Sequence, residues 1–168
     1  IGDKIPVLIL GDFISVEAQP QNWDQVVSNN LESAQLAVEH LIGLGHRNIA
    51  FIQGPEGTPT SKRRLAGFRR ALETAGLPVM DDLVVAGDYN HKGGYLAMKA
   101  LLNRQVRPTA VACANDLSAL GALEAAKQMG YSIPKDLSIV GFDDIDESAL
   151  ASPPLTTIHL SPRHIGKV

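Results

Sequence analysis

The sequence predicts an α/β fold, a doubly wound parallel sheet with helices on both of its faces. Short apolar, β-branched runs alternate along the chain with longer segments of helical period, and that order joins parallel strands through right-handed crossovers. Several runs, among them IAFI, AVACA and SIVGF, are almost continuously apolar. Strands covered on both faces have this composition.

The elements follow in order from these patterns. Apolar runs bounded by turn residues predict strands at Val7–Leu10, Gln25–Ser28, Asn48–Gln53, Leu83–Ala86, Ala110–Ala114, Ser138–Phe142 and Thr156–Leu160. Amphipathic stretches predict helices at Leu31–Leu44, Ser61–Ala75, Lys92–Asn103 and Leu117–Met129. Three of these helices end at a glycine suited to a left-handed cap, namely Gly45, Gly76 and Gly130. Residues 13–24 read as a loop or connector.

Composition limits the functions that the chain can have. Its 168 residues are 45% hydrophobic and 20% charged, with a net charge of -3, which is typical of a soluble globular protein and gives no overall attraction for polyphosphate. No apolar run approaches the ~20 residues of a membrane span. The single cysteine, Cys113, excludes an internal disulfide framework and fits a reducing compartment. The opening IGDKIPVLILGD is no signal peptide, and RHIGKV stops where a helix should begin, so we expect a fragment.

Polar residues follow the predicted strands at the edge where ligands bind in such sheets. This rim suits a polyhydroxylated or heterocyclic small molecule, because amide and carboxylate groups lie beside an aromatic ring. The alternative is that the acidic residues cap the following helices, which we favour for Asp116 and Asp88 but not for Asp143. The rim consists of Thr60, Gly87, Asp88, Tyr89, Asn115, Asp116, Asp143 and Asp144.

A basic helix is expected to follow the loop GPEGTPT. Its apolar stripe is Leu65, Phe68 and Leu72, and the opposite, solvated face carries Lys62, Arg63, Arg69, Arg70 and Glu73, with Arg69 and Glu73 as an i,i+4 ion pair. Arg64 is the exception because it flanks the apolar stripe in the first turn. Its guanidinium suits vicinal hydroxyls or a carboxylate; the alternative is a structural salt bridge to Asp143 or Asp116.

Catalytic and metal-binding patterns are poorly supported. GPEGTPTSK lacks the ending of a phosphate loop, and there is no G-x-G-x-x-G or G-x-S-x-G motif. DDIDE lacks the alternating ligands and glycine of an EF-hand loop. The five histidines have no partners at metal-ligand spacing, and Cys113 reads as a packed, inert thiol. We therefore expect no catalytic residue, no metal, no cofactor and no enzyme activity.

The chain as a whole resembles the effector-binding region of LacI/GalR bacterial transcriptional regulators. The resemblance runs in order from about Val26 to Gly166 and rests on HLIGLGHRNIAFIQGP, RRLAGFRRALETAG, RPTAVACANDLSALGALEAA, VGFDD and PPLTT. VGFDD and PPLTT also favour the regulators over the periplasmic sugar-binding proteins that share the fold.

The resemblance implies a periplasmic-binding-protein-like type I lobe. Residues 1–25 would be the end of an N-terminal lobe and its crossover, residues 26–157 the C-terminal lobe, and residues 158–168 a truncated return crossover. A helix-turn-helix headpiece, absent from this chain, would bind operator DNA.

The resemblance also implies a binding site for a small sugar or nucleoside-like effector. Its residues would be Arg64, Asn115, Asp143, Tyr89 and Thr60. Two departures bear on which effector it takes: Gly11 and then Asp12 follow the first strand, where many members have aspartate directly, and Leu160 replaces the glutamine of some sugar-responsive members.

The implied protein is a cytoplasmic, allosteric repressor without membrane contact. It would form a homodimer, which we expect to use the helix and loop that carry Leu120, Leu123, Met129 and Leu150. A periplasmic sugar-binding protein of an uptake system is the alternative, and a sugar- or nucleotide-processing enzyme is a distant third.

Overall fold

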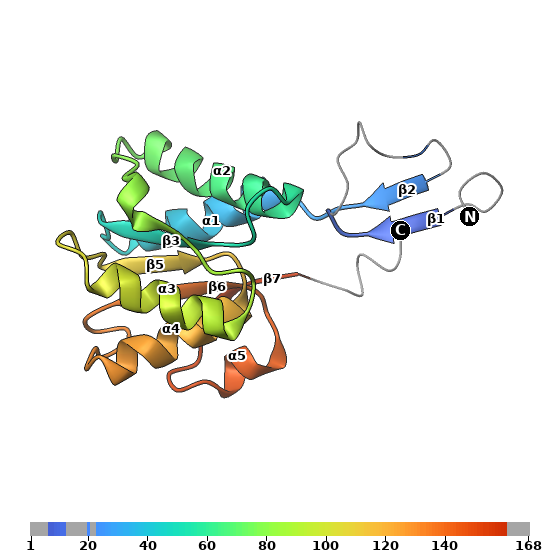
Figure 1. Ribbon diagram of the computed structural model, residues 1–168. Helices are drawn as coiled ribbons and strands as arrows, with labels where there is room; N and C mark the ends of the chain where they lie inside the picture. The colour runs from blue at the N-terminus through green and yellow to red at the C-terminus, as the bar shows by residue number, and fades with distance from the viewer. Residues whose placement is uncertain (1–6, 13–19, 21–22, 161–168) are drawn as a thin grey trace.

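The protein was analysed as a computed structural model, which describes residues 7–12, 20 and 23–160. A five-stranded parallel sheet in the order β4-β3-β5-β6-β7 forms the larger unit, and β1 and β2 pair in parallel as a separate two-stranded sheet beside it (Figure 1). The strands are β1 Val7–Leu10, β2 Trp23–Val26, β3 Ile49–Gln53, β4 Val84–Ala86, β5 Ala110–Cys113, β6 Ser138–Asp143 and β7 Thr156–His159.

Helices cover both faces of the larger sheet, as predicted. Helices α1 and α2 pack on one face around Phe51, Phe68 and Val140, and α3 and α4 pack on the other around Ile52, Met98 and Ile139 (Figure 1). The helices are α1 Asn30–Gly43, α2 Pro59–Thr74, α3 His91–Leu102, α4 Asp116–Gln128 and α5 Asp146–Leu150, with a short 3-10 helix, η2, at Asp81–Leu83. The predicted fold class is therefore confirmed.

The helix ends follow local chemistry. Side chains of Asn29, Thr58, Asn90 and Asn115 accept the amide hydrogens of the first turns of α1, α2, α3 and α4, as polar N-caps do. The predicted glycine caps are confirmed, since Gly45, Gly76 and Gly130 have φ values of 95°, 66° and 86°.

Two details of the prediction change. The segment before β4 begins as η2, and α5 was not predicted at all. In addition, β2 lies two residues earlier than expected, at Trp23–Val26. Within the described ranges no helix is long and apolar enough to cross a membrane.

Because all five strands of the larger sheet are parallel, their carboxyl ends meet at one edge. That edge faces β1 and β2 in Figure 1. The loops that leave this edge carry the residues predicted to form a site.

Candidate functional site

A pocket of about 1050 Å³ lies at the carboxyl ends of the strands and reaches to β1 and β2. Pockets of this size and place accept small molecules in α/β proteins. All five predicted ligand residues contribute to its wall. The full lining is Leu10, Gly11, Asp12, Val26, Ser28, Asn30, Thr60, Arg64, Tyr89, Asn115, Asp143, Asp144, Ile145, Asp146, Glu147, His159 and Leu160.

Arg64 lines the pocket and is buried, with only 6% of its surface exposed. Its Nε donates to Asn30 Oδ1 at 2.9 Å, Nη1 donates to the Ala114 carbonyl, and Nη2 lies 3.4 Å from Asp143 Oδ1. The guanidinium also stacks on the Phe142 ring, 3.5 Å from its centre. A guanidinium has five N–H groups, so one on each terminal nitrogen is left over for a ligand.

The sequence left two roles open for Arg64, a structural salt bridge and a contact to the effector. The salt bridge to Asp143 is present; the effector contact stays a prediction. Burial lowers the pKa of Arg64, and the nearby Asp143 carboxylate opposes that change. The arginine remains charged, because the ordinary pKa of its guanidinium lies far above neutral pH.

Asp143 is the last residue of β6 and begins a strained turn that leads to α5. Its φ is 116° and that of Asp144 is 60°, a region that side chains other than glycine rarely adopt. Burial raises the pKa of Asp143 to about 6; the Arg64 guanidinium acts in the opposite direction, and the charge of Asp116 adds to the increase. The Asp143 carboxyl can therefore change charge near neutral pH.

Tyr89 and Asn115 form a connected wall of the pocket. Asn115 Nδ2 donates to the Tyr89 carbonyl at 3.0 Å, while Asn115 Oδ1 accepts the Ser118 amide at 3.0 Å as the cap of α4. The Tyr89 ring lies directly on Gly54, where a Cβ would come within 2.1 Å of Tyr89 Cζ. Gly54 therefore makes room for the aromatic ring. One N–H of Asn115 remains for a ligand.

Thr60 connects the pocket to the end of β1. Its hydroxyl donates to the Asp12 carbonyl at 3.0 Å, and the Asp12 carboxylate pairs with Arg63 Nε at 3.3 Å. Asp12, the residue at which this chain departs from the LacI/GalR pattern, is buried. Thr60 keeps its oxygen as an acceptor for a ligand.

Two polar residues of the site, Asn30 and His159, escaped the sequence analysis. Asn30 holds Arg64 Nε, and the only signal for it was a repeated asparagine before a predicted helix. His159 Nδ1 lies 2.7 Å from Asp144 Oδ2 at the rim; no spacing rule connects them, because β7 and the β6–α5 turn meet only in the folded sheet.

The cap predicted for Asp116 was wrong. Asn115 caps α4, and Asn90 rather than Asp88 caps α3. Asp116 is instead completely buried and accepts hydrogen bonds from Ile145 N, Ser148 Oγ and Thr157 Oγ1.

The side chains that line this pocket offer hydrogen-bond donors, acceptors and an aromatic ring. In the described part of the chain, no group of histidine, cysteine or acidic side chains could hold a metal ion. Cys113 is buried, and burial raises the pKa of its thiol far above the usual range. The pocket offers N–H donors from Arg64 and Asn115, carboxylate acceptors from Asp143 and a ring from Tyr89, a combination that matches hydroxyl groups, which both donate and accept.

Comparison with known proteins identifies the family to which this fold belongs. A family model described as "Periplasmic binding protein-like domain" matches residues 38–168. The chain belongs to this family.

Its relatives in this family are transcriptional repressors. It is 40% identical to the HTH-type transcriptional repressor PurR of Klebsiella pneumoniae subsp. pneumoniae over 90% of this chain and 44% of PurR, and 41% identical to PurR of Actinobacillus pleuropneumoniae serotype 3 over 98% of this chain and 48% of PurR. The chain thus spans about half the length of the curated relatives that it matches.

Solved structures of transcriptional regulators have the same fold as this chain. A complex of the transcriptional regulator CelR with cellobiose has a TM-score of 0.89 and 32% identity over 97% of this chain and 49% of CelR. A sugar-binding transcriptional regulator of the LacI family from Escherichia coli, complexed with phosphate, has a TM-score of 0.87 and 28% identity over 96% of this chain and 57% of that one. The predicted membership of the LacI/GalR family is confirmed.

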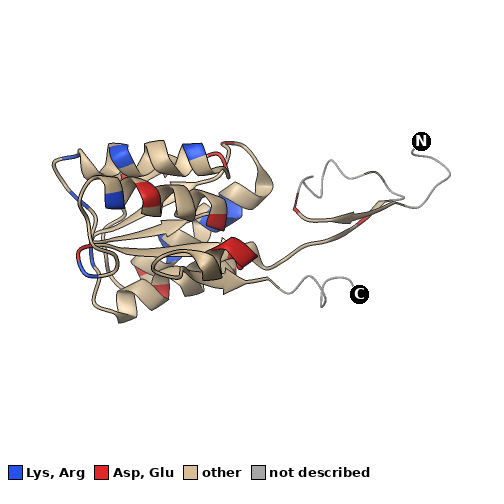
Figure 2. Ribbon diagram, turned by 90° about the horizontal axis from the view of Figure 1, so that it is seen from below, with Lys and Arg blue, Asp and Glu red and all other residues tan. Residues whose placement is uncertain are grey.

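The basic face of α2 is a solvated surface in this family member. Arg63 pairs with Asp12 and Arg69 with Asp81, at 3.1 Å for the second pair; the predicted partner of Arg69 was Glu73, so that pairing was wrong. Figure 2 shows basic and acidic residues interspersed over the larger unit. Two of these cations are therefore paired with carboxylates.

The residues predicted for a dimer interface differ in exposure. Leu150 on α5 is 84% exposed, whereas Leu123 is buried at 6%. Leu120 and Met129 are half-buried, and Met129 packs against the core below α4. Only part of the predicted set is therefore free to meet another molecule.

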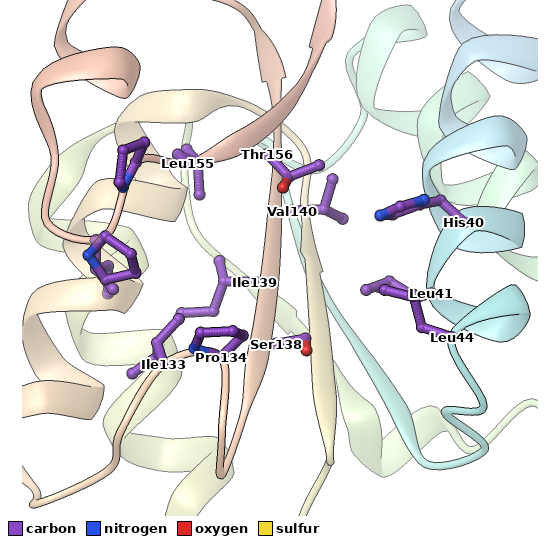
Figure 3. A pocket seen from close by; sticks show the side chains of 13 residues that line it. His40, Leu41, Leu44, Ile133, Pro134, Ser138, Ile139, Val140, Leu155 and Thr156 are labelled. Carbon is purple, nitrogen blue, oxygen red and sulfur yellow. The ribbon is translucent and has the colours of Figure 1, made fainter.

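A second hollow, of about 240 Å³, lies beside β7. His40, Leu41 and Leu44 of α1 face it from one side, and Ile133, Pro134 and Leu155 lie on the other (Figure 3). No Asp, Glu, Lys or Arg side chain is among its described lining residues, and its polar side chains are those of His40, Ser138 and Thr156.

Proposed function

We propose that this chain is the effector-sensing region of a DNA-binding transcriptional repressor, and that a small sugar or nucleoside-like molecule binds in the strand-end pocket. The observation that carries the proposal is the buried Arg64, which is fixed by protein contacts yet keeps two N–H groups free beside Asp143 and Asn115. Such a rigid donor and acceptor set lowers the entropic cost of binding a polar ligand.

The proposed ligand contacts divide among the five residues. Arg64 and Asn115 donate to ligand oxygens, Asp143 accepts from ligand hydroxyls, Thr60 accepts through its oxygen, and the Tyr89 ring covers an apolar face of the ligand. CelR forms a complex with cellobiose, which supports a carbohydrate as the first class to test. We infer no catalysis, since the relatives act as repressors.

The allosteric mechanism follows from the position of the pocket. We infer that residues 26–157 form the C-terminal lobe and that residues 1–25 and 158–168 cross to a second lobe. The pairing of β1 with β2 outside the larger sheet supports the first boundary, whereas β7 continues the larger sheet to His159, two residues past the second. An effector that touches both lobes binds one interlobe arrangement more tightly and shifts the population of a helix-turn-helix headpiece between operator-binding and free forms. Such a repressor works in the cytoplasm, where its operator lies.

A binding screen tests the proposed function. The full-length natural protein is heated with neutral sugars, cellobiose included, and with nucleosides, and each compound that raises the melting temperature is titrated by calorimetry. The Asp143→Asn variant should bind that compound about 10-fold or more weakly, because a hydrogen bond to a charged group contributes about 1.5–3 kcal/mol. Lys62→Ala, on the solvated face of the same helix as Arg64, is the matched control.

Two results of this screen would count against the proposal. Stabilisation by no compound of either class would reject the effector class. Equal affinity of wild type and Asp143→Asn would reject the site.

We also propose that the protein is a homodimer that uses the α5 surface around Leu150. Leu150 is the member of the predicted set that is most exposed, at 84%, so it is the residue to test first. Sedimentation of Leu150→Glu should give the monomer mass where wild type gives the dimer. If Leu150→Glu still forms the dimer, the interface does not include the α5 surface.

A further inference from the structure

The buried side chain of Asp116 is not among the ligand contacts, yet its hydrogen bonds all go to the segment that follows Asp143. We propose that Asp116 is a positioning residue for the pocket: its carboxylate holds the β6–α5 turn in the conformation that directs Asp143 toward Arg64. The benefit of this positioning rests on the proposed function, since Asp143 is a proposed ligand contact. The conformation of the turn itself does not depend on a ligand.

Three donors converge on this carboxylate. Asp116 Oδ2 accepts from the Ile145 amide at 3.0 Å and from the Ser148 hydroxyl at 2.7 Å, and Oδ1 accepts from the Thr157 hydroxyl at 2.6 Å. Among the described residues no ion pair involves Asp116. The charge of a buried carboxylate without a paired cation is stabilised by its hydrogen-bond donors. The three donors and the Asp116 carboxylate therefore hold one another in position.

Thr157 extends this control to Asp144. Because the Thr157 hydroxyl gives its hydrogen to Asp116, its oxygen faces the Asp144 amide as an acceptor at 3.3 Å. Asp144 N–H, Thr157 O–H and the Asp116 carboxylate thus form a chain in which each bond polarises the next. Asp116 orients Thr157, and Thr157 fixes the turn.

The turn needs such support because it is strained. Asp143 and Asp144 both have positive φ values, 116° and 60°, and neither is a glycine. Backbone conformations of this kind persist only when the surrounding structure determines them. The turn is tied on one side by β6, where Asp143 pairs with His159 of β7, and on the other side by the bond from Ile145 to Asp116.

The neighbouring strand is shaped around this carboxylate. A Cβ at Gly141 would lie 2.1 Å from Asp116 Oδ1 and 2.9 Å from Leu155 Cδ2. The glycine in the middle of β6 therefore leaves the space that Asp116 fills.

The simplest competing explanation is that Asp116 only anchors α5. The two roles differ in what they predict for Asp116→Asn. An amide keeps one acceptor oxygen but places an NH2 group against donors, so at least one of the three contacts is lost. If Asp116 only anchors α5, the protein loses stability but the Asp143 turn is unchanged. If Asp116 positions the turn, the turn itself moves.

Crystal structures of the full-length protein distinguish these outcomes. In Asp116→Asn, φ of Asp143 and Asp144 should leave the positive region, and Arg64 Nη2 should separate from Asp143 Oδ1 beyond the ~4 Å of an ion pair. The β5 and β6 backbones should stay in place. Glu124→Gln, an exposed carboxylate substitution on the same helix, should leave the turn unchanged.

Thr157→Val provides a second variant if Asp116→Asn does not fold. It leaves the carboxylate in place but removes the link to Asp144, so Asp144 should lose its positive φ. A turn that keeps both positive φ values in the folded variants would overturn the proposal. A negative ligand screen would reject the proposed function without affecting this result, because the structures are determined without a ligand.

Discussion

Replacing Arg64 by alanine tests the framework on which the pocket is built. The substitution leaves the Asn30 oxygen and the Ala114 carbonyl without their donor, and it removes the guanidinium from the Phe142 ring. Each buried acceptor left unsatisfied costs about 1–3 kcal/mol, and a desolvated cation–π contact contributes about 0.5–2 kcal/mol.

These contributions are not additive. The substitution also removes the ion pair with Asp143, and the cost of that loss is reduced by solvent. The Asp143 side chain is 33% exposed, so after loss of Arg64 its carboxylate can be solvated in part. We therefore expect Arg64→Ala to lower the free energy of unfolding by about 4 kcal/mol, within the ~3–5 kcal/mol seen when one member of a buried ion pair is removed. Arg64→Lys should lose about half as much, since it keeps the charge but not the planar fork.

The assay is equilibrium unfolding in urea at pH 7.5, followed by circular dichroism at 222 nm. Arg70→Ala is the control, because Arg70 is exposed on the same helix and such a change should stay within about 0.5 kcal/mol. An Arg64→Ala protein as stable as the Arg70→Ala control would mean that the buried hydrogen-bond set does not exist in solution.

Three further predictions concern the pocket and the core. Gly54→Ala should push the Tyr89 ring out of its place, lower stability by about 1–3 kcal/mol, and show a displaced ring in a crystal structure; an unmoved ring would contradict the packing described. Since burial raises the pKa of Asp143 to about 6, affinity for a sugar bound in the pocket should be high above that pH and fall as the carboxylate is protonated below it. The same titration should be flat in Asp143→Asn. Burial also raises the pKa of Cys113, so the thiol should resist Ellman's reagent in the native protein and react in urea; a fast native reaction would show that its strand opens.

The fold could be predicted from sequence because its signals are local. Each helix of α1 to α4 has a clear apolar period, a polar cap and, in three cases, a terminal glycine with positive φ. Helix α5 was missed because five residues, Asp146–Leu150, are too short to show a period. The η2 turn was missed for the same reason.

The site was predictable only in part, since its contacts join distant segments. Arg64 could be singled out because a charge beside an apolar stripe is locally anomalous. Asn30 and Asp116 could not, because the partner of each lies in another segment, and an asparagine or aspartate at a helix start normally acts as a cap. Arg69 shows the same effect on the surface, where Asp81 replaced the expected helical neighbour.

The pocket wall draws on segments from opposite ends of the described chain, with Asp12 after β1 and Asp143 at the end of β6. A molecule that bridges them would act as a reversible cross-link and remove chain entropy from any partly opened state. The first opening to be suppressed is the separation of the β1–β2 pair from the larger unit, because Asp12 is held there by single contacts to Thr60 and Arg63. Hydrogen exchange at the amides of Val7–Leu10, the strand whose last residue lines the pocket, should then be slower when the pocket is occupied.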